Sequence, residues 1–317
     1  MTVKNPSVSI LMPAYNHEAF IGEAIESVLS QTFEDFEFII INDGSTDRTD
    51  YIIREYSDPR LNYYYHKNQG MANTLNKGLR ISKGEYIAII NSDDVYSKER
   101  LEILLTITKK DNLNFLITDI DLIDETSKPI TDPTHWWIKW YEFLKSVYTN
   151  SRSPVDALMA GNYTISTSNF FFHRRLIQSI GFFKPYRYIS DYDFALRAAI
   201  YQPSKFRFIV GQKLLLYRLH GKNTIMSNPL AANHETFYFL VNSMKKVLGK
   251  NVTIPLEHIN KIKKYIVKEL SLKYKSQLSY IIHELDDTKQ RHAEVLRELD
   301  DTKQRHAEVL RELDDTK

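Results

Sequence analysis

The residues best suited to chemistry in this 317-residue chain stand in three short loops rich in amides and carboxylates. The loops read Pro13-Ala14-Tyr15-Asn16, Asn42-Asp43-Gly44-Ser45 and Asn91-Ser92-Asp93-Asp94. A carboxylate such as Asp43 can accept a base N–H, and adjacent Asp93 and Asp94 offer hard oxygen ligands for a divalent cation that also bridges phosphates. Each loop alone is also an ordinary turn or helix-capping sequence. The prediction of a nucleotide and metal site therefore depends on whether the three loops meet.

The elements between these loops predict that they do meet. Over the first 120 residues, short apolar runs alternate with helical patterns, which is typical of βαβ units and a largely parallel sheet. We expect strands at Val8–Met12, Phe36–Ile41, Leu61–Tyr65, Tyr86–Ile90 and Asn114–Ile120, and helices at Glu18–Ser30, from a cap at Ser45 to Tyr56, Ala72–Ser82 and Lys98–Lys110. Each polar loop follows a strand, and open α/β sheets bind ligands beyond the carboxyl ends of their strands.

The middle of the chain predicts an aromatic segment and then further elements. Residues 121–165 have a looser pattern, and five aromatic residues crowd into eight positions: Trp136, Trp137, Trp140, Tyr141 and Phe143. This segment is either an acceptor-side element or an amphipathic helix whose aromatic residues form ordinary core. We expect a strand at Asn169–Phe172, a helix at Asp191–Ile200, and one or two strands within Phe206–Tyr217.

Composition excludes several classes of protein. The chain has 42 basic and 40 acidic residues, a net charge of +2, so there is no electrostatic case for a nucleic-acid partner. It has no cysteine, which excludes disulfides and thiolate metal sites. No apolar run has the length of a leader or of a membrane span. P-loop, dinucleotide-binding and zinc-protease motifs are also missing from the sequence. We expect a cytoplasmic protein, soluble or peripheral at the inner face of the membrane.

Together and in this order, the motifs resemble the nucleotide-sugar-dependent glycosyltransferases of family 2, which have the fold called GT-A. The resemblance runs from Val8 to about Ser227. Four segments carry it: SILMPAYNHEAFIGEAIESVLSQTFEDFEFIIINDGSTDRT, NQGMANTLNKGLRISKGEYIAIINSDD, SIGFF with YISDYDFALRAA, and LYRLHGKNT. The resemblance implies an α/β sheet flanked by helices that transfers a sugar, with inversion, from a nucleoside-diphosphate donor, of which a UDP-sugar is the first expectation. It also implies a glycan or lipid-linked acceptor, in bacterial surface polysaccharide or glycoconjugate synthesis.

The resemblance also implies roles for single residues. The nucleotide would be bound by Pro13, Ala14, Tyr15, Asn16, Asp43, Asn68, Gly70, Ser92 and Asp93, with Asp43 reading the base. A divalent cation, Mn²⁺ or Mg²⁺, would be held on the donor diphosphate by Asp93, Asp94 and His220. Asp191 would be the general base that deprotonates the acceptor hydroxyl.

Three positions leave alternatives open. The family often has an acidic residue where this chain has Asn91, and often Glu where it has Ser190. Ser190 could cap a helix in an S-x-x-D pattern, and Asp193 is a second candidate for the base. His220 is either a metal or phosphate contact or a structural histidine. The alternative functions are a nucleotidylyltransferase, which releases pyrophosphate, and a non-catalytic sugar-nucleotide binder with a coiled-coil spacer.

Beyond a catalytic domain at residues 1–227, the pattern predicts a helical extension at 228–282 and 14-residue repeats at 283–317. Lysines lie among the apolar positions of Ile259–Leu270, which indicates either an anionic membrane contact or a helix packed on its own domain. The repeat ELDDTKQRHAEVLR occurs twice, and a third copy begins at Glu312 and stops within the repeat at Lys317, so we expect the natural protein to continue. Its heptad leucines predict a coiled-coil homo-oligomer, against the alternative of a single solvated helix: Leu285, Leu296, Leu299, Leu310 and Leu313.

Overall fold

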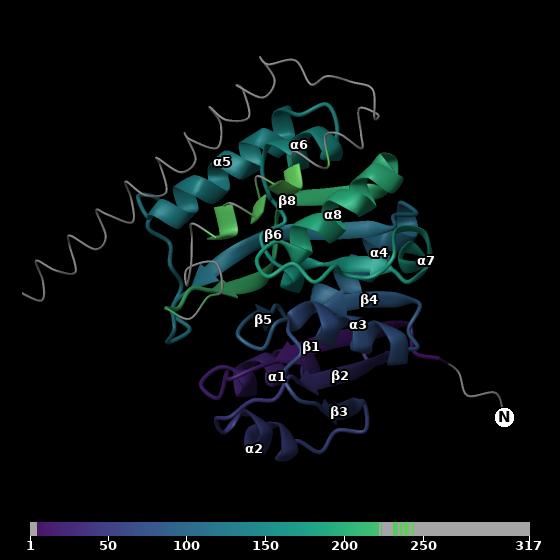
Figure 1. Ribbon diagram of the computed structural model, residues 1–317, viewed down its shortest axis with the longest axis vertical. Helices are drawn as coiled ribbons and strands as arrows, with labels where there is room; N and C mark the ends of the chain where they lie inside the picture. Colours follow the sequence, from purple (N-terminus) through teal and green to yellow (C-terminus); the bar gives the residue numbers. More distant parts are fainter. Residues whose placement is uncertain are drawn as a thin grey trace, which may run out of the picture. The chain divides into compact units, whose positions relative to one another are not determined.

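The structure is a computed structural model that describes residues 5–221, 223, 231–233, 235–236, 238–240 and 243 (Figure 1). The chain divides into two compact units, Met1–Pro133 with Tyr141–Ile254, and Thr134–Trp140 with Pro255–Lys317. Every candidate site residue belongs to the first unit. The predicted lysine-rich helix and the coiled-coil repeat lie outside the described residues, so the homo-oligomer, the membrane contact and the proposed domain boundaries stay predictions.

The described residues build one eight-stranded sheet in the order β3-β2-β1-β4-β7-β6-β8-β5. Its strands are β1 Val8–Ala14, β2 Phe36–Asn42, β3 Leu61–Tyr65, β4 Tyr86–Ile89, β5 Val95–Tyr96, β6 Phe115–Ile123, β7 Phe171–His173 and β8 Phe206–Arg218. β7 is antiparallel to both β4 and β6, and β5 is antiparallel to β8, while the other pairings are parallel. The expected largely parallel sheet is therefore confirmed, with β7 inserted in the opposite direction between its two parallel parts.

The first part of the sheet is the apolar βαβ arrangement that the sequence predicts. β1 and β2 are buried along almost their whole length, as expected of strands covered on both faces. The helices here are α1 Ile21–Leu29, α2 Thr49–Arg54, α3 Met71–Ile81 and α4 Arg100–Lys110. α3 packs on β1 and β2, and a Cβ at Gly78 would lie 3.3 Å from Leu11 and 3.4 Å from Ile41. Glycine therefore allows this close approach of helix to sheet.

The second part of the chain adds shorter elements around β6 and β8. These are α5 Trp136–Asn150, α6 Pro154–Ala160, η1 Thr167–Asn169, α7 Arg175–Ile180, α8 Ser190–Tyr201 and η2 Pro203–Lys205. The aromatic segment is thus a helix, and its Tyr141 and Leu144 are buried, as the core alternative requires. Stacked aromatic rings fill the region between β7, β8 and α8, including Phe115 on Phe206 and Phe183 on Phe194.

Two expected helix starts are wrong. α2 begins at Thr49 rather than after a cap at Ser45, because the Ser45 hydroxyl accepts a hydrogen bond from the backbone N–H of Asn16 instead. Ser190 is the first residue of α8, and Ile189 is its N-cap. The Ser190 hydroxyl donates to the carbonyl of Lys184, so the S-x-x-D pattern forms no capping box.

The expected strand at Asn169–Phe172 begins later than predicted, because residues 167–169 form the turn η1 and β7 starts at Phe171. Within the described residues, no helix combines the length and the apolar character that crossing a membrane requires.

Candidate active site

The loops after β1 and β2 form the first part of the site, and main-chain groups join them. Asn16 has a left-handed backbone with φ of 52°, and its side-chain oxygen accepts from the N–H of Thr46 at 2.8 Å. The N–H of Asp43 donates to the carbonyl of Ala14 at 2.8 Å. Tyr15 between them is 45% exposed, so an aromatic ring lies open to a ligand at this edge. Pro13 and Ala14, both expected at the nucleotide, end β1 beside Ile41 and Asn42 of β2.

Asp43 lies where β2 meets the start of α3. Its carboxylate is buried and accepts from the N–H of Gln69 at 2.8 Å and of Gly70 at 3.0 Å. The Nε2 of His66 lies 3.4 Å away, and burial lowers the pKa of this imidazole although the charge of Asp43 opposes the shift. Asp43 therefore ties the predicted base-reading position to the loop that contains Asn68 and Gly70.

Gly44 allows these two loops to touch. It has φ of +75°, and a Cβ there would lie 2.7 Å from the backbone nitrogen of Asn68. A side chain at this position would push the loops apart, and an L-residue would also be strained in this conformation. The predicted nucleotide-binding residues of the first 70 positions are therefore brought together, as the strand-end rule requires.

Asp93 and Asp94 follow β4 in the third loop, and they have different surroundings. Asp94 is buried, and its carboxylate accepts from the Ser168 hydroxyl at 2.5 Å and from the N–H of Arg218 at 2.9 Å. Burial, followed by the negative charge of Asp93, raises the pKa of Asp94 well above its usual value. For Asp93, burial acts in the same direction, but the hydrogen bond with His220 and the charges of His17 and His220 outweigh it and lower the pKa. Within this pair, the pKa of Asp93 is therefore lowered and that of Asp94 is raised.

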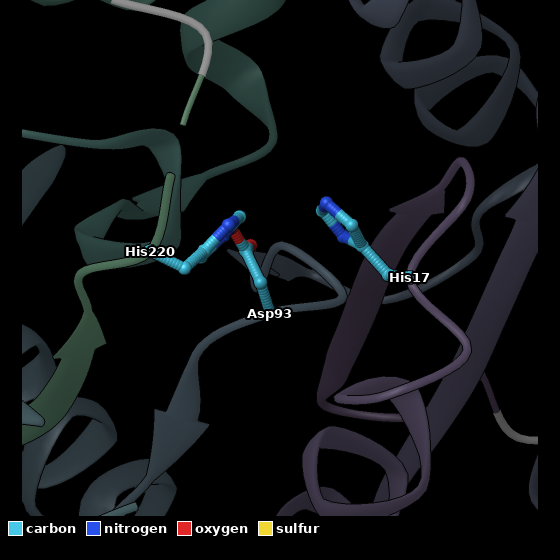
Figure 2. A group of neighbouring side chains, drawn as sticks. All are labelled: His17, Asp93 and His220. Carbon is cyan, nitrogen blue, oxygen red and sulfur yellow. The ribbon is translucent and has the colours of Figure 1, made fainter. Parts of the chain in front are cut away.

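Asp93 lies within a compact group of potential metal ligands. One ligand atom each from His17, Asp93 and His220 can be chosen so that all three lie within 4.8 Å of one another (Figure 2). The Nε2 of His220 is 2.9 Å from a carboxylate oxygen of Asp93. The other side of the group is joined to the third loop, since Nδ1 of His17 lies 2.8 Å from the Ser92 hydroxyl. Two imidazoles and one carboxylate are a donor set that fits a divalent transition-metal ion.

A buried arginine, Arg218, connects the segments that carry these ligands. Arg218 is 1% exposed, and its guanidinium donates to the carbonyl of Asp93 at 2.8 Å and to the carboxylate of Glu23 at 2.5 Å. It also donates to the carbonyl of Asp124 and lies over the ring of Phe20. Arg218 therefore connects β8, α1 and the Asp93 loop, and it places His220 two residues further along the chain.

Asn91, which stands where the resembling family often has an acid, has structural partners in the turn η1. Its amide nitrogen donates to the Ser166 hydroxyl at 3.0 Å, and its side-chain oxygen accepts from the Thr167 hydroxyl at 2.9 Å. Its backbone N–H donates to the hydroxyl of Ser168, which in turn donates to Asp94. Asn91 thus fastens the carboxylate loop to residues 166–168.

Asp191 and Asp193 both stand in the first turn of α8 but have different partners. Asp193 is 1% exposed and pairs with Lys184 at 2.6 Å and Arg197 at 2.6 Å. Asp191 is half-buried, and its carboxylate accepts from the side-chain amide of Asn162 at 3.2 Å and from the backbone N–H groups of Asp191 and Tyr192. Burial raises the pKa of Asp191 to about 6. The pairing of Asp193 favours a structural role, whereas Asp191 has the raised pKa that suits a base near neutral pH.

Tyr217 shows that Asp191 and the carboxylate loop share one neighbourhood. Burial, and then the charges of Asp94, Asp93 and Asp191, raise the pKa of this phenol well above its usual value. All three carboxylates therefore lie near enough to Tyr217 of β8 for their charges to act on its phenol.

The sequence reasoning missed His17, Asn162, Ser168 and Arg218. His17 had a usable signal, because it directly follows the loop after β1 and was therefore bound to reach the shared edge. The other three gave none, since an isolated serine, asparagine or arginine reaches the site only through contacts with segments distant along the chain.

Comparisons with known proteins agree with this fold. The chain is 31% identical over 266 residues to chondroitin synthase of Escherichia coli, which covers 82% of this chain and 36% of that protein. It is 34% identical over 121 residues to the UDP-Glc:alpha-D-GlcNAc-diphosphoundecaprenol beta-1,3-glucosyltransferase WfgD of Escherichia coli, which covers 38% and 48%. The chain spans between 18% and 40% of the length of six of the curated relatives it matches.

A solved structure has the same fold. The mannosyltransferase PcManGT from Pyrobaculum calidifontis, in complex with GDP-Man and Mn²⁺, matches with a TM-score of 0.59 and 17% identity, over 88% of this chain and 76% of that one. The sheet, its flanking helices and this likeness define a glycosyltransferase fold of the GT-A type. The family model "Glycosyl transferase family 2" matches residues 9–181, and the chain belongs to that family.

Proposed function

We propose that this protein is an inverting, metal-dependent glycosyltransferase that moves a sugar from a nucleoside-diphosphate donor to an acceptor hydroxyl. The observation that carries the proposal is the shared neighbourhood of two kinds of group: the His17, Asp93 and His220 set, and the half-buried carboxylate of Asp191. Inverting transfer needs a stabilised leaving group and a general base, and these two sets of side chains are suited to those tasks.

The donor lies, in this proposal, along the carboxyl ends of β1, β2 and β4. Asp43 faces the base, while Pro13, Ala14, Tyr15, Asn16, Asn68 and Gly70 surround the nucleoside. Ser92 and Asp93 reach toward the diphosphate, and Asp94 supports the loop from its buried position. A divalent cation, Mn²⁺ or Mg²⁺, bound at Asp93 and His220 would neutralise charge on the departing nucleoside diphosphate.

The acceptor is activated by Asp191. Its carboxylate takes the proton of the acceptor hydroxyl as that oxygen bonds to the anomeric carbon and the bond from this carbon to the diphosphate oxygen breaks. The half-buried setting keeps the base poorly solvated, and the Asn162 amide orients it. One-step displacement from the opposite face inverts the anomeric centre.

A UDP-sugar is the proposed donor, and a glycan or a lipid-linked saccharide is the proposed acceptor. The names of two relatives support this choice. WfgD is named for a UDP-Glc donor and a diphosphoundecaprenol-linked acceptor. The relative that matches over 266 residues is named as a chondroitin synthase. We place the activity in the synthesis of a bacterial surface polysaccharide or glycoconjugate, on the cytoplasmic side of the membrane.

The test is a panel of nucleotide sugars incubated with the protein and Mn²⁺, with release of the nucleoside diphosphate as the readout. We expect one UDP-sugar to be hydrolysed slowly without acceptor and excess chelator to stop the reaction. Release of pyrophosphate from a nucleoside triphosphate and a sugar phosphate would instead identify a nucleotidylyltransferase. Binding of a donor without turnover under any condition would identify a passive binder.

A further inference from the structure

We propose that His17 is a third protein ligand of the metal ion, so that the chain binds a divalent transition metal by itself, before any nucleotide arrives. The inference builds on the function proposed above, because it concerns the same site. It differs in its claim: the ion is held by two imidazoles and one carboxylate of the protein and does not need the donor diphosphate to complete its binding.

The distances fit a shared ion. Two ligand atoms about 2.1 Å from one metal and at right angles to each other are about 3 Å apart, and atoms on opposite sides are about 4.2 Å apart. The Nε2 of His220 and the carboxylate of Asp93 are 2.9 Å apart, which fits adjacent ligands. All three candidate atoms lie within 4.8 Å of one another, which is close to the separation of two ligands on opposite sides of one ion.

Neighbouring groups already orient both rings. The Ser92 hydroxyl lies 2.8 Å from Nδ1 of His17 and so helps to fix the orientation of this ring beside Asp93. Such a second contact to a ligating imidazole sets its orientation in many metal sites. The ring of Phe20 packs against both histidines, with ring centroids 6.0 Å from His17 and 4.8 Å from His220. His17 and His220 themselves meet edge to face at 5.7 Å.

Asp94 does not belong to this group of three. One of its carboxylate oxygens accepts from the N–H of Arg218 and the other from the Ser168 hydroxyl. Its carboxylate is therefore directed to the protein, and we assign to it the positioning of the loop. His17 takes the place among the ligands that the adjacent-aspartate pattern suggested for Asp94.

The donor set has a chemical consequence. Mg²⁺ prefers oxygen ligands and keeps much of its water. Imidazole nitrogen binds transition metals, with an affinity that is lowest for Mn²⁺ and higher for Co²⁺, Ni²⁺ and Zn²⁺. Two imidazoles should therefore raise the affinity for transition metals well above that for Mg²⁺. Three ligands on one side of the ion leave the remaining positions for water or for phosphate oxygens of the donor.

The experiment uses Mn²⁺ alone, with the full chain and no nucleotide. Mn²⁺ binding is measured by loss of the free-ion EPR signal, and ¹⁴N modulation of the bound ion counts coordinated imidazoles. We expect wild type to bind with the modulation of two nitrogens. His17→Gln should bind at least about tenfold more weakly, with the modulation of one nitrogen, since a ligand matters no less than the outer groups whose loss costs 10–100-fold.

Two further variants separate this effect from loss of fold. His17→Asp retains a ligand atom, so it should keep measurable Mn²⁺ binding but lose one nitrogen from the spectrum. His173→Gln is the matched control. His173 ends β7, where it contacts Glu85 and the backbone N–H of Arg175. This variant should therefore bind Mn²⁺ as the wild type does. Thermal unfolding of each variant without metal checks that the fold is intact.

Two results would overturn the inference. One is a wild-type protein that binds Mn²⁺ only when UDP is added. The other is a folded His17→Gln protein with wild-type affinity and an unchanged nitrogen count. These outcomes can be told apart from failure of the proposed function. A protein that binds Mn²⁺ through two imidazoles but cleaves no nucleotide sugar would contradict the proposed function and still support the metal site.

Discussion

The carboxylates of Asp43 after β2 and Asp191 at α8 both accept from backbone N–H groups, but Asp43 is buried against a distant loop, whereas Asp191 is half-buried and also contacts a distant side chain. Asp43 accepts from two backbone N–H groups and donates its own N–H to Ala14. Asp191 accepts from the N–H groups of its own helix turn and from the side-chain amide of Asn162 at 3.2 Å. Main-chain contacts survive most substitutions, while a side-chain contact is lost with one residue. The comparison indicates that a single substitution at Asn162 can change the surroundings of Asp191, whereas the contacts of Asp43 with backbone N–H groups do not depend on the neighbouring side chains.

In the function proposed here, this difference separates two kinds of defect. A substitution in the first region should change the affinity for donor or metal. A substitution around α8 should change turnover and its pH dependence while leaving donor binding in place. Asp93 stands where the two regions meet, so its loss should affect both quantities.

The largest effect is expected for Asp93→Ala. The leaving group then loses the charged ligand that holds its metal, and metal stabilisation contributes several kcal/mol. Turnover should fall by about three orders of magnitude or more, at 1.36 kcal/mol for each factor of ten. Steady-state release of nucleoside diphosphate at saturating Mn²⁺ measures this, and Mn²⁺ titration measures the metal affinity.

The matched control for this change is Asp121→Ala, which removes an exposed carboxylate paired with Lys213. Exposed ion pairs contribute little to stability, so this variant should keep wild-type turnover. An Asp93→Ala protein that retains activity in excess chelator would show that no metal at this position takes part.

The second effect is a loss of turnover with donor binding intact. Asp191→Asn keeps the shape and the Asn162 neighbour but removes the base, so kcat should fall about 10²–10⁴-fold. The dissociation constant for UDP, measured by calorimetry with Mn²⁺, should stay within about twofold of wild type.

Asp193→Asn tests the same helix two residues further along. Its carboxylate is buried against Arg197 and Lys184, and breaking such a pair costs about 3–5 kcal/mol of folding free energy. We expect a lower melting temperature with near-normal turnover per folded molecule. The reverse result, a catalytic loss here and normal turnover in Asp191→Asn, would transfer the role of base to Asp193.

The third effect concerns pH. Burial raises the pKa of Asp191 to about 6, and a base acts only when deprotonated. At saturating donor and Mn²⁺, kcat should level off above pH 7 and fall about tenfold for each pH unit well below 6. A kcat that stays constant down to pH 4.5, with the protein folded, would contradict the assignment.

The smallest effect is expected for Asn162→Ala. The Asn162 amide donates to the charged form of Asp191 and lowers its pKa. Removing the amide should therefore raise this pKa, move the acidic fall in kcat to higher pH, and reduce kcat a few-fold at pH 7. Asn162→Asp should move this fall in kcat to still higher pH, because it adds a negative charge beside the base and so raises the pKa of Asp191 further. If both variants show the wild-type profile, the contact does not set the reactivity of Asp191.

The sequence predicts the region up to about residue 110 better than it predicts the surroundings of α8 and β8. The strands and helices up to residue 110, apart from the two-residue strand β5, agree with the expected elements within a few residues, because β1 and β2 are continuous apolar runs and α1 buries Ile21, Ala24, Ile25 and Val28 at helical spacing. The strand-end rule then brought Asp43 and Gly70 together correctly. Here local pattern and tertiary structure agree.

Other features depend on contacts that no local pattern records. The Ser45 hydroxyl could cap a helix, but it bonds to Asn16, 29 residues away. Asp193 and Asp191 have the same residue type in the same helix turn, and only the approach of Lys184, Arg197 and Asn162 separates their roles. The roles expected from the family resemblance remain to be tested by the substitutions above.

Arg218 also determines when the site can form during synthesis. Its guanidinium bonds to Glu23 across a separation of 195 residues, and His220 meets Asp93 across 127. Contacts between such distant residues form late, because a long segment must first be ordered. A ribosome releasing this chain from its N-terminus therefore exposes the complete βαβ region well before Arg218 emerges. The nascent polypeptide can join the loops after β1 and β2 early, and it brings His220 to Asp93 only after strand β8 has paired with β6.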